Sequence, residues 1–363
     1  MKSITDGEGG RMPDKPAYNG PVRIAVDAMG GDHAPMEIIK GALQAAEMPG
    51  VEIILVGPMK ELERELANVS YKHLPLRLVG ATEVIMDGDN PIIAVMRKPK
   101  SSMAVAAKLV KAGEADAMVS AGSTGAVMIS ALQYLGTLPG VDRPMVGGPF
   151  LQLAPNTFVL DMGANIGCQA YHLLNFAIAG SVFVKKFLGI ESPTVGLLNV
   201  GVEEGKGNEI VKEAYSLLKD SGLNFVGNVE GMDIPLGKAN VIVCDGFVGN
   251  IILKFCEGLG NVVADWLAGE LNGKLPKEEA DIVTSKLLSL VSPAKAAGGG
   301  PIWGVDGVAF IAHGSSRSEQ VAAAIGQAAD TVRSRFVETL KLELEKAQRT
   351  LANNSHQTQE GGN

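Results

Sequence analysis

The sequence has little positive charge and few cysteines. Its 363 residues include 32 lysines and arginines against 40 aspartates and glutamates, a formal net charge of −8. Because nucleic-acid-binding proteins normally carry a basic face or stripe, no nucleic-acid partner is expected. The three cysteines, Cys168, Cys244 and Cys256, lie far apart without a C-x-x-C pair. This spacing predicts neither a disulfide framework nor a zinc ribbon and is typical of a cytoplasmic protein.

Long apolar runs and targeting signals are also missing. No stretch approaches the roughly 18 uninterrupted apolar residues of a membrane-spanning helix, so we do not expect the chain to cross a bilayer. Residues 1–20 are polar and rich in glycine and proline, which predicts a disordered leader without the apolar segment of a signal peptide. Residues 351–363 are rich in Asn, Gln and Gly, which predicts a disordered tail.

The remaining residues, 21–350, alternate short runs of Val, Ile and Leu with longer segments of helical spacing. This alternation predicts one α/β domain with a doubly wound, mostly parallel sheet covered by helices on both faces. Strands are expected at residues 22–28, 51–56, 76–79, 117–120, 157–160, 194–199, 224–226, 241–244 and 308–312. Residues 272–300, with two prolines and a triple glycine, predict an irregular helical excursion. An apolar stripe from Val321 to Leu344 predicts one long final helix.

Glycine, aspartate and asparagine gather where these strands end. In open α/β sheets, ligands bind beyond the carboxyl ends of the strands, where loops enter helices and backbone N–H groups point outward. A turn or a helix cap explains any one such loop, but their number favours a cradle in which small residues let the backbone approach an anion. The candidate binding residues are Asp27, Gly30, Gly31, Asp32, Ser120, Gly122, Ser123, Thr124, Gly125, Asn199, Gly201, Asp245, Gly246 and Asn250.

Nucleotide and metal motifs are not found in the sequence. Neither G-x-x-x-x-G-K-[ST] nor, after the first strand, G-x-G-x-x-G occurs, so a small phosphate is expected rather than a nucleotide. Asp27, Asp32 and His33 lack the spacing of a metal-ligand set, and no metal is predicted. Cys168 could accept an acyl group as a nucleophile, but a buried, inert thiol is the favoured interpretation.

Together, several segments resemble the bacterial phosphate acyltransferase family. They include IAVDAMGGDHAP at 24–35, SAGSTGA at 120–126, GLLNVG at 196–201, KGNE at 206–209 and AHGSS at 312–316. The resemblance implies an enzyme that makes acyl phosphate from inorganic phosphate and an acyl carrier protein thioester for phospholipid synthesis, without a cofactor. It also implies a homodimer with a fold related to phosphate acetyltransferases and isocitrate dehydrogenases. Peripheral attachment at the inner membrane face and a membrane glycerol-phosphate acyltransferase as a partner belong to the same expectation.

Within this resemblance, a few side chains are candidates for the chemistry. Asn165 and Asn228 would donate hydrogen bonds to phosphate and oxyanion, and either His33 or His313 would serve as general acid. Candidates for steering the acidic carrier protein are Arg97, Lys98, Lys100 and Arg143. Three alternatives stay open: a phosphate acetyl- or butyryltransferase acting on acyl-CoA, a non-catalytic lipid- or carrier-binding scaffold, and an NAD-linked dehydrogenase of similar fold.

Overall fold

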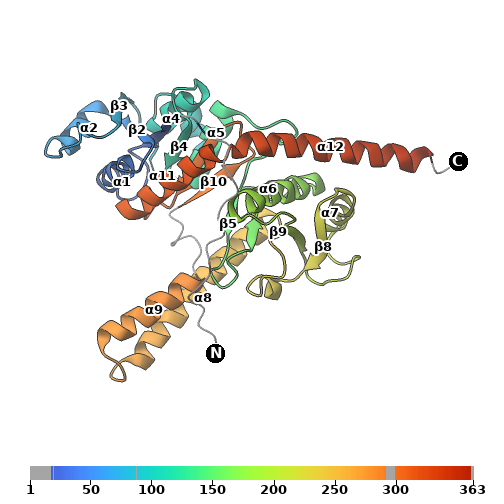
Figure 1. The fold of residues 1–363 in the computed structure, drawn as a ribbon. Coiled ribbons are helices and arrows are strands. Elements are labelled where there is room, and N and C mark those ends of the chain that lie inside the picture. Colours follow the sequence, from blue (N-terminus) through green and yellow to red (C-terminus); the bar gives the residue numbers. More distant parts are fainter. Residues whose placement is uncertain (1–17, 19, 87, 292–298, 361–363) are drawn as a thin grey trace.

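The computed structural model describes residues 18, 20–86, 88–291 and 299–360, and its side chains up to residue 350. Most of the predicted leader lies outside these residues. Eleven strands form one sheet in the order β3-β2-β1-β4-β11-β10-β5-β6-β9-β7-β8 (Figure 1). They are β1 (Val22–Asp27), β2 (Val51–Gly57), β3 (Leu76–Gly80), β4 (Ala117–Ser120), β5 (Met145–Pro149), β6 (Phe158–Leu160), β7 (Thr194–Leu198), β8 (Asn224–Val229), β9 (Val241–Val243), β10 (Gly299–Trp303) and β11 (Val308–Ala312).

All nine predicted strands are present, and the sheet has two further strands that were not predicted. The missed strands, β5 and β10, contain the segments Gly147-Gly148-Pro149 and Gly299-Gly300-Pro301. Glycine and proline are depleted in strands because they weaken or interrupt the ladder, so neither segment carries a strand signal. Seven of the ten strand pairings are parallel and three are antiparallel, which confirms a mostly parallel α/β sheet.

The two strands that were not predicted, β5 and β10, set the relative strand direction of the two halves of the sheet. The upper lobe consists of β3, β2, β1, β4 and β11, which are mutually parallel, and the lower lobe consists of β6, β9, β7 and β8, which are also mutually parallel. Antiparallel pairings of β10 and β5 join the lobes, and β5 pairs antiparallel with β6. The two parallel blocks therefore run in opposite senses along the ladder. At about 20–25° of twist per strand, the four steps from β4 to β6 also rotate the strand direction by roughly 90°.

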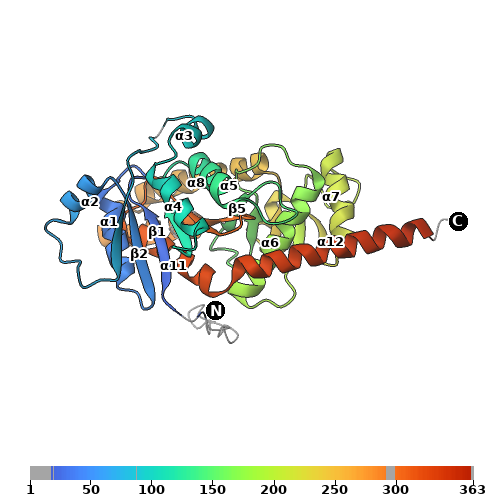
Figure 2. The ribbon, with the colours of Figure 1, turned by 90° about the horizontal axis from the view of Figure 1, so that it is seen from above.

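Helices cover both faces of each lobe, as the sequence predicted. The described helices are α1 (Met36–Ala46), α2 (Met59–Leu66), α3 (Pro91–Arg97), α4 (Ser102–Lys111), α5 (Thr124–Leu135), α6 (Ala170–Leu188), α7 (Glu209–Asp220), the 3₁₀ helix η1 (Gly231–Asp233), α8 (Gly246–Leu271), α9 (Lys277–Val291), α11 (Ser318–Arg333) and α12 (Phe336–Glu360). In the upper lobe, α1 and α11 cover one face while α4 and α5 cover the other (Figure 2). In the lower lobe, α6 and α12 pack on one face and the start of α8 on the other.

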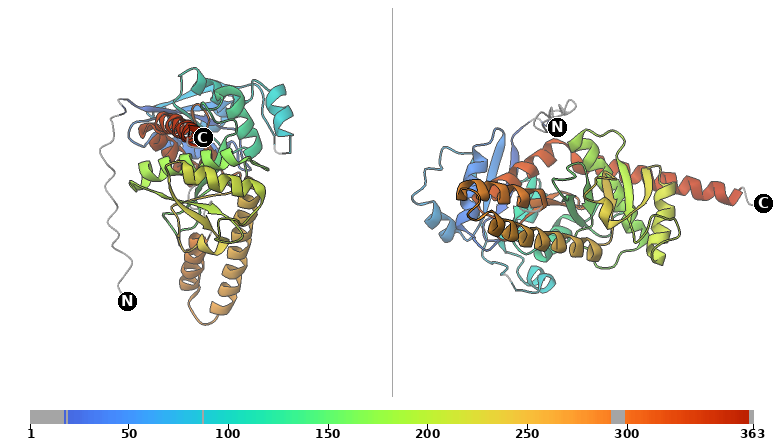
Figure 3. Two further views of the ribbon diagram at one scale, coloured as in Figure 1. Left: turned by 90° about the vertical axis from the view of Figure 1, so that its right-hand side faces the viewer. Right: turned by 90° about the horizontal axis from the view of Figure 1, so that it is seen from below.

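The predicted excursion at 272–300 is part of a helical hairpin. Helices α8 and α9 run side by side and project from the lower lobe (Figures 1 and 3). Residues 292–298 of the excursion lie outside the described residues. Large apolar side chains stay exposed along α8 at positions three or four apart: Phe247, Ile251, Phe255, Leu259, Val262 and Trp266. Among the described residues, α8 alone is long and apolar enough to span a membrane, a test that buried core helices also meet.

The predicted final helix is two helices. Its stripe of apolar residues is continuous, but Arg335 adopts a positive φ of 53° between α11 and α12 and breaks the helical path. Apolar periodicity does not report such a break, because residues on both sides face buried clusters. Helix α12 continues to Glu360, past the predicted domain end at residue 350, and extends away from both lobes (Figures 1 and 2).

Candidate active site

The ends of β1, β4 and β11 meet in one cluster, which we call the upper cradle (residues 27–33, 120–123 and 313–315). The carboxylate of Asp27 is buried, and its Oδ2 accepts a 2.7 Å hydrogen bond from Oγ of Ser120. Its Oδ1 accepts from the backbone N–H of Met29 at 3.1 Å. The Ser120 Oγ in turn accepts from the N–H of Gly122 at 3.1 Å. A single buried carboxylate therefore organises two of the predicted loops.

Backbone packs directly against backbone in the upper cradle. A Cβ on Gly30 would lie 2.6 Å from the Gly122 nitrogen, so no larger residue fits there. The N–H of Asp32 donates a 2.9 Å hydrogen bond to the carbonyl of Gly314, and Gly31 between these loops has a φ of +106°. Burial raises the pKa of Asp27, against hydrogen bonds from Ser102 and Ser120 that lower it. Six predicted residues, Asp27, Gly30, Gly31, Asp32, Ser120 and Gly122, thus lie together.

The N-terminus of α5 adds hydroxyl groups beside this cluster. Ser123 occupies the N-cap position but makes no side-chain capping hydrogen bond. Thr124 begins the helix and is exposed. Because the first N–H groups of a helix lack intrahelical acceptors, an anion placed here would meet them together with the two hydroxyls. Gly125 has a packing role, since a Cβ there would lie 3.0 Å from the ring of Pro91 on α3.

Both candidate histidines belong to the upper cradle, and the structure distinguishes them. His313 is exposed, and its Nδ1 lies 2.9 Å from Oγ and 3.4 Å from the backbone nitrogen of Ser315. Ser315 Oγ can donate to Nδ1 or accept from it according to the protonation of the ring, and Nε2 makes no hydrogen bond among the described residues. His33 is half-buried, and among the described residues its ring makes no hydrogen bond.

A second cluster surrounds Asp161, in the loop from residue 161 to 168 that follows β6. The Asp161 carboxylate is fully buried and accepts five N–H hydrogen bonds. The donors are the backbone N–H groups of Val146, Gly163, Ala164 and Asn165 and the Nδ2 of Asn165, at 2.7 to 3.2 Å. Burial raises the pKa of Asp161, and the hydrogen bonds from Ala164 and Asn165 oppose that effect. Asp161 was not among the site residues predicted from the sequence.

Asn165 holds this loop in place. Its Nδ2 donates to the Pro144 carbonyl and to Asp161, both at 2.8 Å, which uses both amide hydrogens. We therefore assign Asn165 a positioning role in place of the predicted donor role. Gly246, at the start of α8, packs onto the same loop, since a Cβ there would lie 2.8 Å from both Asn165 N and Asp161 Oδ2. Asp245 caps α8 through a 2.9 Å bond from the Val248 N–H, and the exposed Asn250 side chain lies over Gly163.

The remaining predicted amides lie near the end of β7 and on β8. Asn199 ties the loop 200–208 together, because its Nδ2 donates to the Lys206 carbonyl at 3.1 Å and its Oδ1 accepts from the Val200 N–H at 2.8 Å. Gly201 is buried inside this loop. The buried Asn228 donates through Nδ2 to the Glu203 carbonyl at 2.8 Å, while its Oδ1 has no hydrogen-bond partner among the described residues. None of these groups contacts the upper cradle.

The predicted carrier-docking residues divide into free and engaged side chains. Arg97 and Lys100 are exposed, and among the described residues neither side chain is in an ion pair. Lys98 is engaged, because its Nζ donates to Asp89 at 2.6 Å and to the Val84 carbonyl at 2.9 Å. Arg143 donates to the Gly167 carbonyl at 2.9 Å and so holds the Asp161 loop.

The cysteines near the Asp161 loop, Cys168 and Cys244, are buried. Burial, together with the charges of Asp161 and Asp245, raises the pKa of Cys168 to about 11 and that of Cys244 well above its ordinary value. A thiol with such a pKa is protonated at neutral pH and is a poor nucleophile. Among the described residues, no group of His, Cys, Asp and Glu could hold a metal ion.

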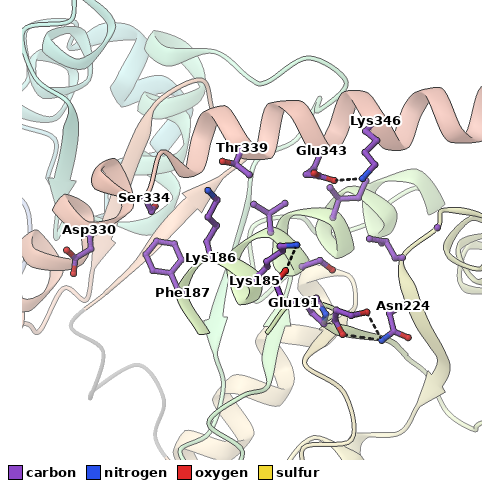
Figure 4. A pocket seen from close by; sticks show the side chains of 17 residues that line it. Lys185, Lys186, Phe187, Glu191, Asn224, Asp330, Ser334, Thr339, Glu343 and Lys346 are labelled. Atoms are coloured by element: carbon purple, nitrogen blue, oxygen red, sulfur yellow. Dashed lines mark hydrogen bonds and ion pairs between the residues drawn. The ribbon is translucent and has the colours of Figure 1, made fainter. Parts of the chain in front are cut away.

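Two cavities of similar size lie in the lower lobe. The apolar groove, about 540 Å³, opens between the Asp161 loop, the end of β7 and the starts of α7 and α8. The other cavity, about 500 Å³, lies between α6, β8 and α12 (Figure 4). Four of its charged side chains pair with one another, Lys185 with Glu191 at 2.7 Å and Lys346 with Glu343 at 3.6 Å. It is lined by none of the predicted site residues, so the groove is the cavity associated with the candidate site.

The predicted strand ends are thus held by two separate hydrogen-bonded clusters. Among the described residues, no hydrogen bond or ion pair joins the upper cradle to the Asp161 loop. Seen from above, β1 runs from the side of the N-terminus toward the side on which α3 and α8 lie (Figure 2). Helix α8 starts directly after β9, so the end of β9 lies on this side as well. The twist of the sheet thus turns the strand ends of both lobes toward the same side.

Comparison with known sequences identifies close relatives over most of the chain. Residues 22–339 match the family described as "Fatty acid synthesis protein". A phosphate acyltransferase of Desulforamulus reducens is 44% identical over 330 residues, covering 89% of this chain and 98% of the relative. Relatives of the same name from Pelotomaculum thermopropionicum and Thermosynechococcus vestitus are also 44% identical, over 89% and 88% of this chain and 95% and 94% of theirs.

Solved structures with the same fold share little sequence with this chain. The EutD phosphotransacetylase from Staphylococcus aureus superposes with a TM-score of 0.56 at 17% identity, covering 85% of this chain and 94% of its own. A phosphotransacetylase from Streptococcus pyogenes gives a TM-score of 0.56 at 18% identity, with the same coverage. At these identities the comparison establishes the fold alone, and it confirms the phosphate acetyltransferase-like architecture expected from the sequence.

Proposed function

We propose substrates for this chain, which belongs to the fatty acid synthesis protein family and is an acyltransferase whose relatives are phosphate acyltransferases. It transfers a long-chain acyl group from acyl carrier protein to inorganic phosphate, and the acyl phosphate feeds glycerophospholipid synthesis. The observation that carries this proposal is the upper cradle, where backbone amides, two free hydroxyls and the N-terminus of α5 converge without a nucleotide-binding motif.

The upper cradle is suited to a small tetrahedral anion. Helix N-termini and close-packed glycine backbone favour phosphate without the need for a lysine. The Asp161 loop is a poorer phosphate site, since its carboxylate already takes up the surrounding N–H groups. We place phosphate at Gly122, Ser123 and Thr124.

The reaction is acyl transfer to phosphate oxygen. A phosphate oxygen attacks the thioester carbonyl and forms a tetrahedral oxyanion, which collapses as the carbon–sulfur bond breaks and the carrier thiolate leaves. Positioning of the two reactants and donors to the oxyanion are what the site must supply. The His313 imidazolium is held at Nδ1 by Ser315 Oγ, protonates the departing thiolate through Nε2 and becomes neutral imidazole.

The surface of α3 is suited to the carrier protein. Ile92, Ile93 and Met96 are 50 to 71% exposed on this short helix, and the unpaired cations Arg97 and Lys100 lie next to them. Apolar contacts flanked by positive charge complement an acidic helical partner. Because Pro91 packs on Gly125 at the start of α5, a carrier bound to α3 is held beside the phosphate site.

The protein is proposed to work in the cytoplasm as a homodimer. The row of exposed apolar residues on α8 supports a second copy or an inner-membrane surface as its cover, and a membrane glycerol-phosphate acyltransferase would then take the product. No organic cofactor or metal is needed for the reaction as proposed.

Labelled phosphate tests the reaction. The protein is incubated with [32P]phosphate and palmitoyl carrier protein, palmitoyl-CoA or acetyl-CoA, and acyl phosphate is trapped as the hydroxamate. We expect product chiefly from the carrier thioester, with one carrier thiol released per phosphate incorporated. Faster reaction with acetyl-CoA would identify a phosphate acetyltransferase instead. Absence of phosphate-dependent thiol release from every thioester would indicate a non-catalytic scaffold.

A further inference from the structure

We propose that the apolar groove beside the Asp161 loop binds the acyl chain of the thioester and that its α7 side limits chain length. This inference depends on the proposed function. The floor of the groove is formed by buried Leu173, Leu197 and Cys244. Its rim carries exposed Ile166 and Val200, which are 78% and 81% accessible to solvent.

The chemistry of the lining restricts what the groove can bind. Asp245 is the only charged residue that lines it, and its carboxylate is engaged by the Val248 N–H. The polar lining residues Asn199 and Asn208 are engaged as well. Asn199 bonds to Lys206 and Val200, and Asn208 caps α7 by accepting from the Val211 N–H at 2.9 Å. Phosphopantetheine, a nucleotide or an acidic peptide would each bury polar groups here without partners, at a large cost in affinity. A hydrocarbon chain has no such groups.

The position of the groove fits the same occupant. Its inner end is formed by Cys168 and Asp245, which adjoin Asn165 and Gly246 of the second cluster. From there it extends past the end of β7 to Ile210 and Val211 on α7. At about 540 Å³ it lies in the usual size range of small-ligand sites, roughly 300 to 1,000 Å³. A chain entering at the inner end would point its methyl end toward α7.

The α8 side of the groove continues into the exposed apolar face of this helix. Phe247 lines the groove, and Ile251 and Phe255 follow it at four-residue intervals on the same face of the helix. This continuity favours a long-chain substrate over an acetyl group.

Filling the α7 end of the groove tests the proposal. Ile210 is 36% exposed, so Ile210→Trp places an indole in the groove without replacing a core residue. Val69→Trp, at a position 42% exposed and outside the groove, is the matched control. We expect kcat/KM for palmitoyl carrier protein to fall at least tenfold in Ile210→Trp and that for butyryl carrier protein to stay within twofold, because each buried methylene contributes roughly fourfold. Val69→Trp should match the wild type with both substrates.

Binding without turnover separates the two proposals. Calorimetric titration with hexadecanoate should show at least tenfold weaker binding to Ile210→Trp than to wild type or Val69→Trp. A wild-type protein that forms no acyl phosphate but shows this binding difference would refute the proposed reaction and support the groove. An active Ile210→Trp with an unchanged chain-length profile and unchanged hexadecanoate affinity would overturn the groove proposal. A change in oligomeric state, seen by light scattering, without any change in chain-length profile or hexadecanoate affinity would also overturn the groove proposal, since a second copy would then occupy the groove.

Discussion

Ser120 Oγ lies 2.7 Å from Asp27 Oδ2 and donates to it, which ties the end of β4 to the end of β1. The same hydroxyl accepts from Gly122, so one serine links a buried carboxylate to the backbone that we place against phosphate. Ser120→Ala should lower kcat/KM for phosphate and destabilise the fold by about 1–3 kcal/mol, because Asp27 loses a donor inside the protein.

Ser130→Ala is the control for this prediction. Ser130 is as buried as Ser120, but among the described residues its Oγ has no hydrogen-bond partner. Urea unfolding and phosphate titration should show little change in Ser130→Ala. Equal effects in the two variants would mean that the bond to Asp27 does not organise the cradle.

Asp161→Asn should disrupt the second cluster. An amide in place of the carboxylate would turn an NH2 group toward N–H donors and leave several of five hydrogen bonds unmade. We expect a loss of about 3 kcal/mol or more in the free energy of unfolding, since a hydrogen bond to a charged group contributes roughly 1.5–3 kcal/mol. Asp245→Asn, which keeps a helix-capping oxygen, should cost much less. Unfolding midpoints in urea that agree for both variants would contradict the central role of Asp161.

His313→Gln should slow the departure of the carrier thiol. Loss of a general acid typically costs 10² to 10⁴ in rate, and glutamine keeps hydrogen-bonding capacity without donating a proton. His33→Gln should have a smaller effect, because the His33 ring has no orienting partner among the described residues. The test is an acyl thiophenol thioester, whose thiolate leaves without a proton and should restore the rate of His313→Gln. A larger defect in His33→Gln, corrected by the same substrate, would exchange the two assignments.

Charge reversal on α3 should weaken carrier binding selectively. We expect the double variant Arg97→Glu and Lys100→Glu to raise KM for palmitoyl carrier protein about tenfold with kcat unchanged, because exposed charges act mainly on encounter. The effect should shrink at high salt, and KM for palmitoyl-CoA should not move. Lys60→Glu on α2 is an exposed control. An equal rise in KM for palmitoyl-CoA would place α3 in the acyl site instead of the docking surface.

Cys168 should react slowly with alkylating reagents. With its pKa raised from 9.0 to about 11, the thiolate fraction at pH 7.5 is about 100-fold smaller than for an ordinary thiol. The folded state holds this proton more tightly than the unfolded chain, so the resulting stability is present below about pH 9 and is lost as pH rises toward about 11. Wild-type stability should therefore fall more steeply than that of Cys168→Ala over this range. Fast carboxymethylation at neutral pH, or an inactive Cys168→Ala, would indicate a catalytic thiol.

Local sequence accounts for the elements but not for their junctions. The buried strands of both lobes were predictable because runs of Val, Ile and Leu report burial directly. Strands β5 and β10 were not, since their glycines and prolines carry turn signals and only pairing with neighbours makes them strands. The break at Arg335 was hidden for a similar reason: the apolar stripe continues while the backbone changes direction.

The sequence by itself determined the α/β class, the family and the composition of the loops, because these depend on residue type and spacing along the chain. Only the tertiary structure decided which loops meet. The antiparallel junction of β10, β5 and β6 separates the strand ends into two clusters, and burial then selects Asp161 from the 40 acidic residues of the chain as an organising carboxylate. Pairing direction and burial arise from contacts between distant segments, and no local pattern encodes them.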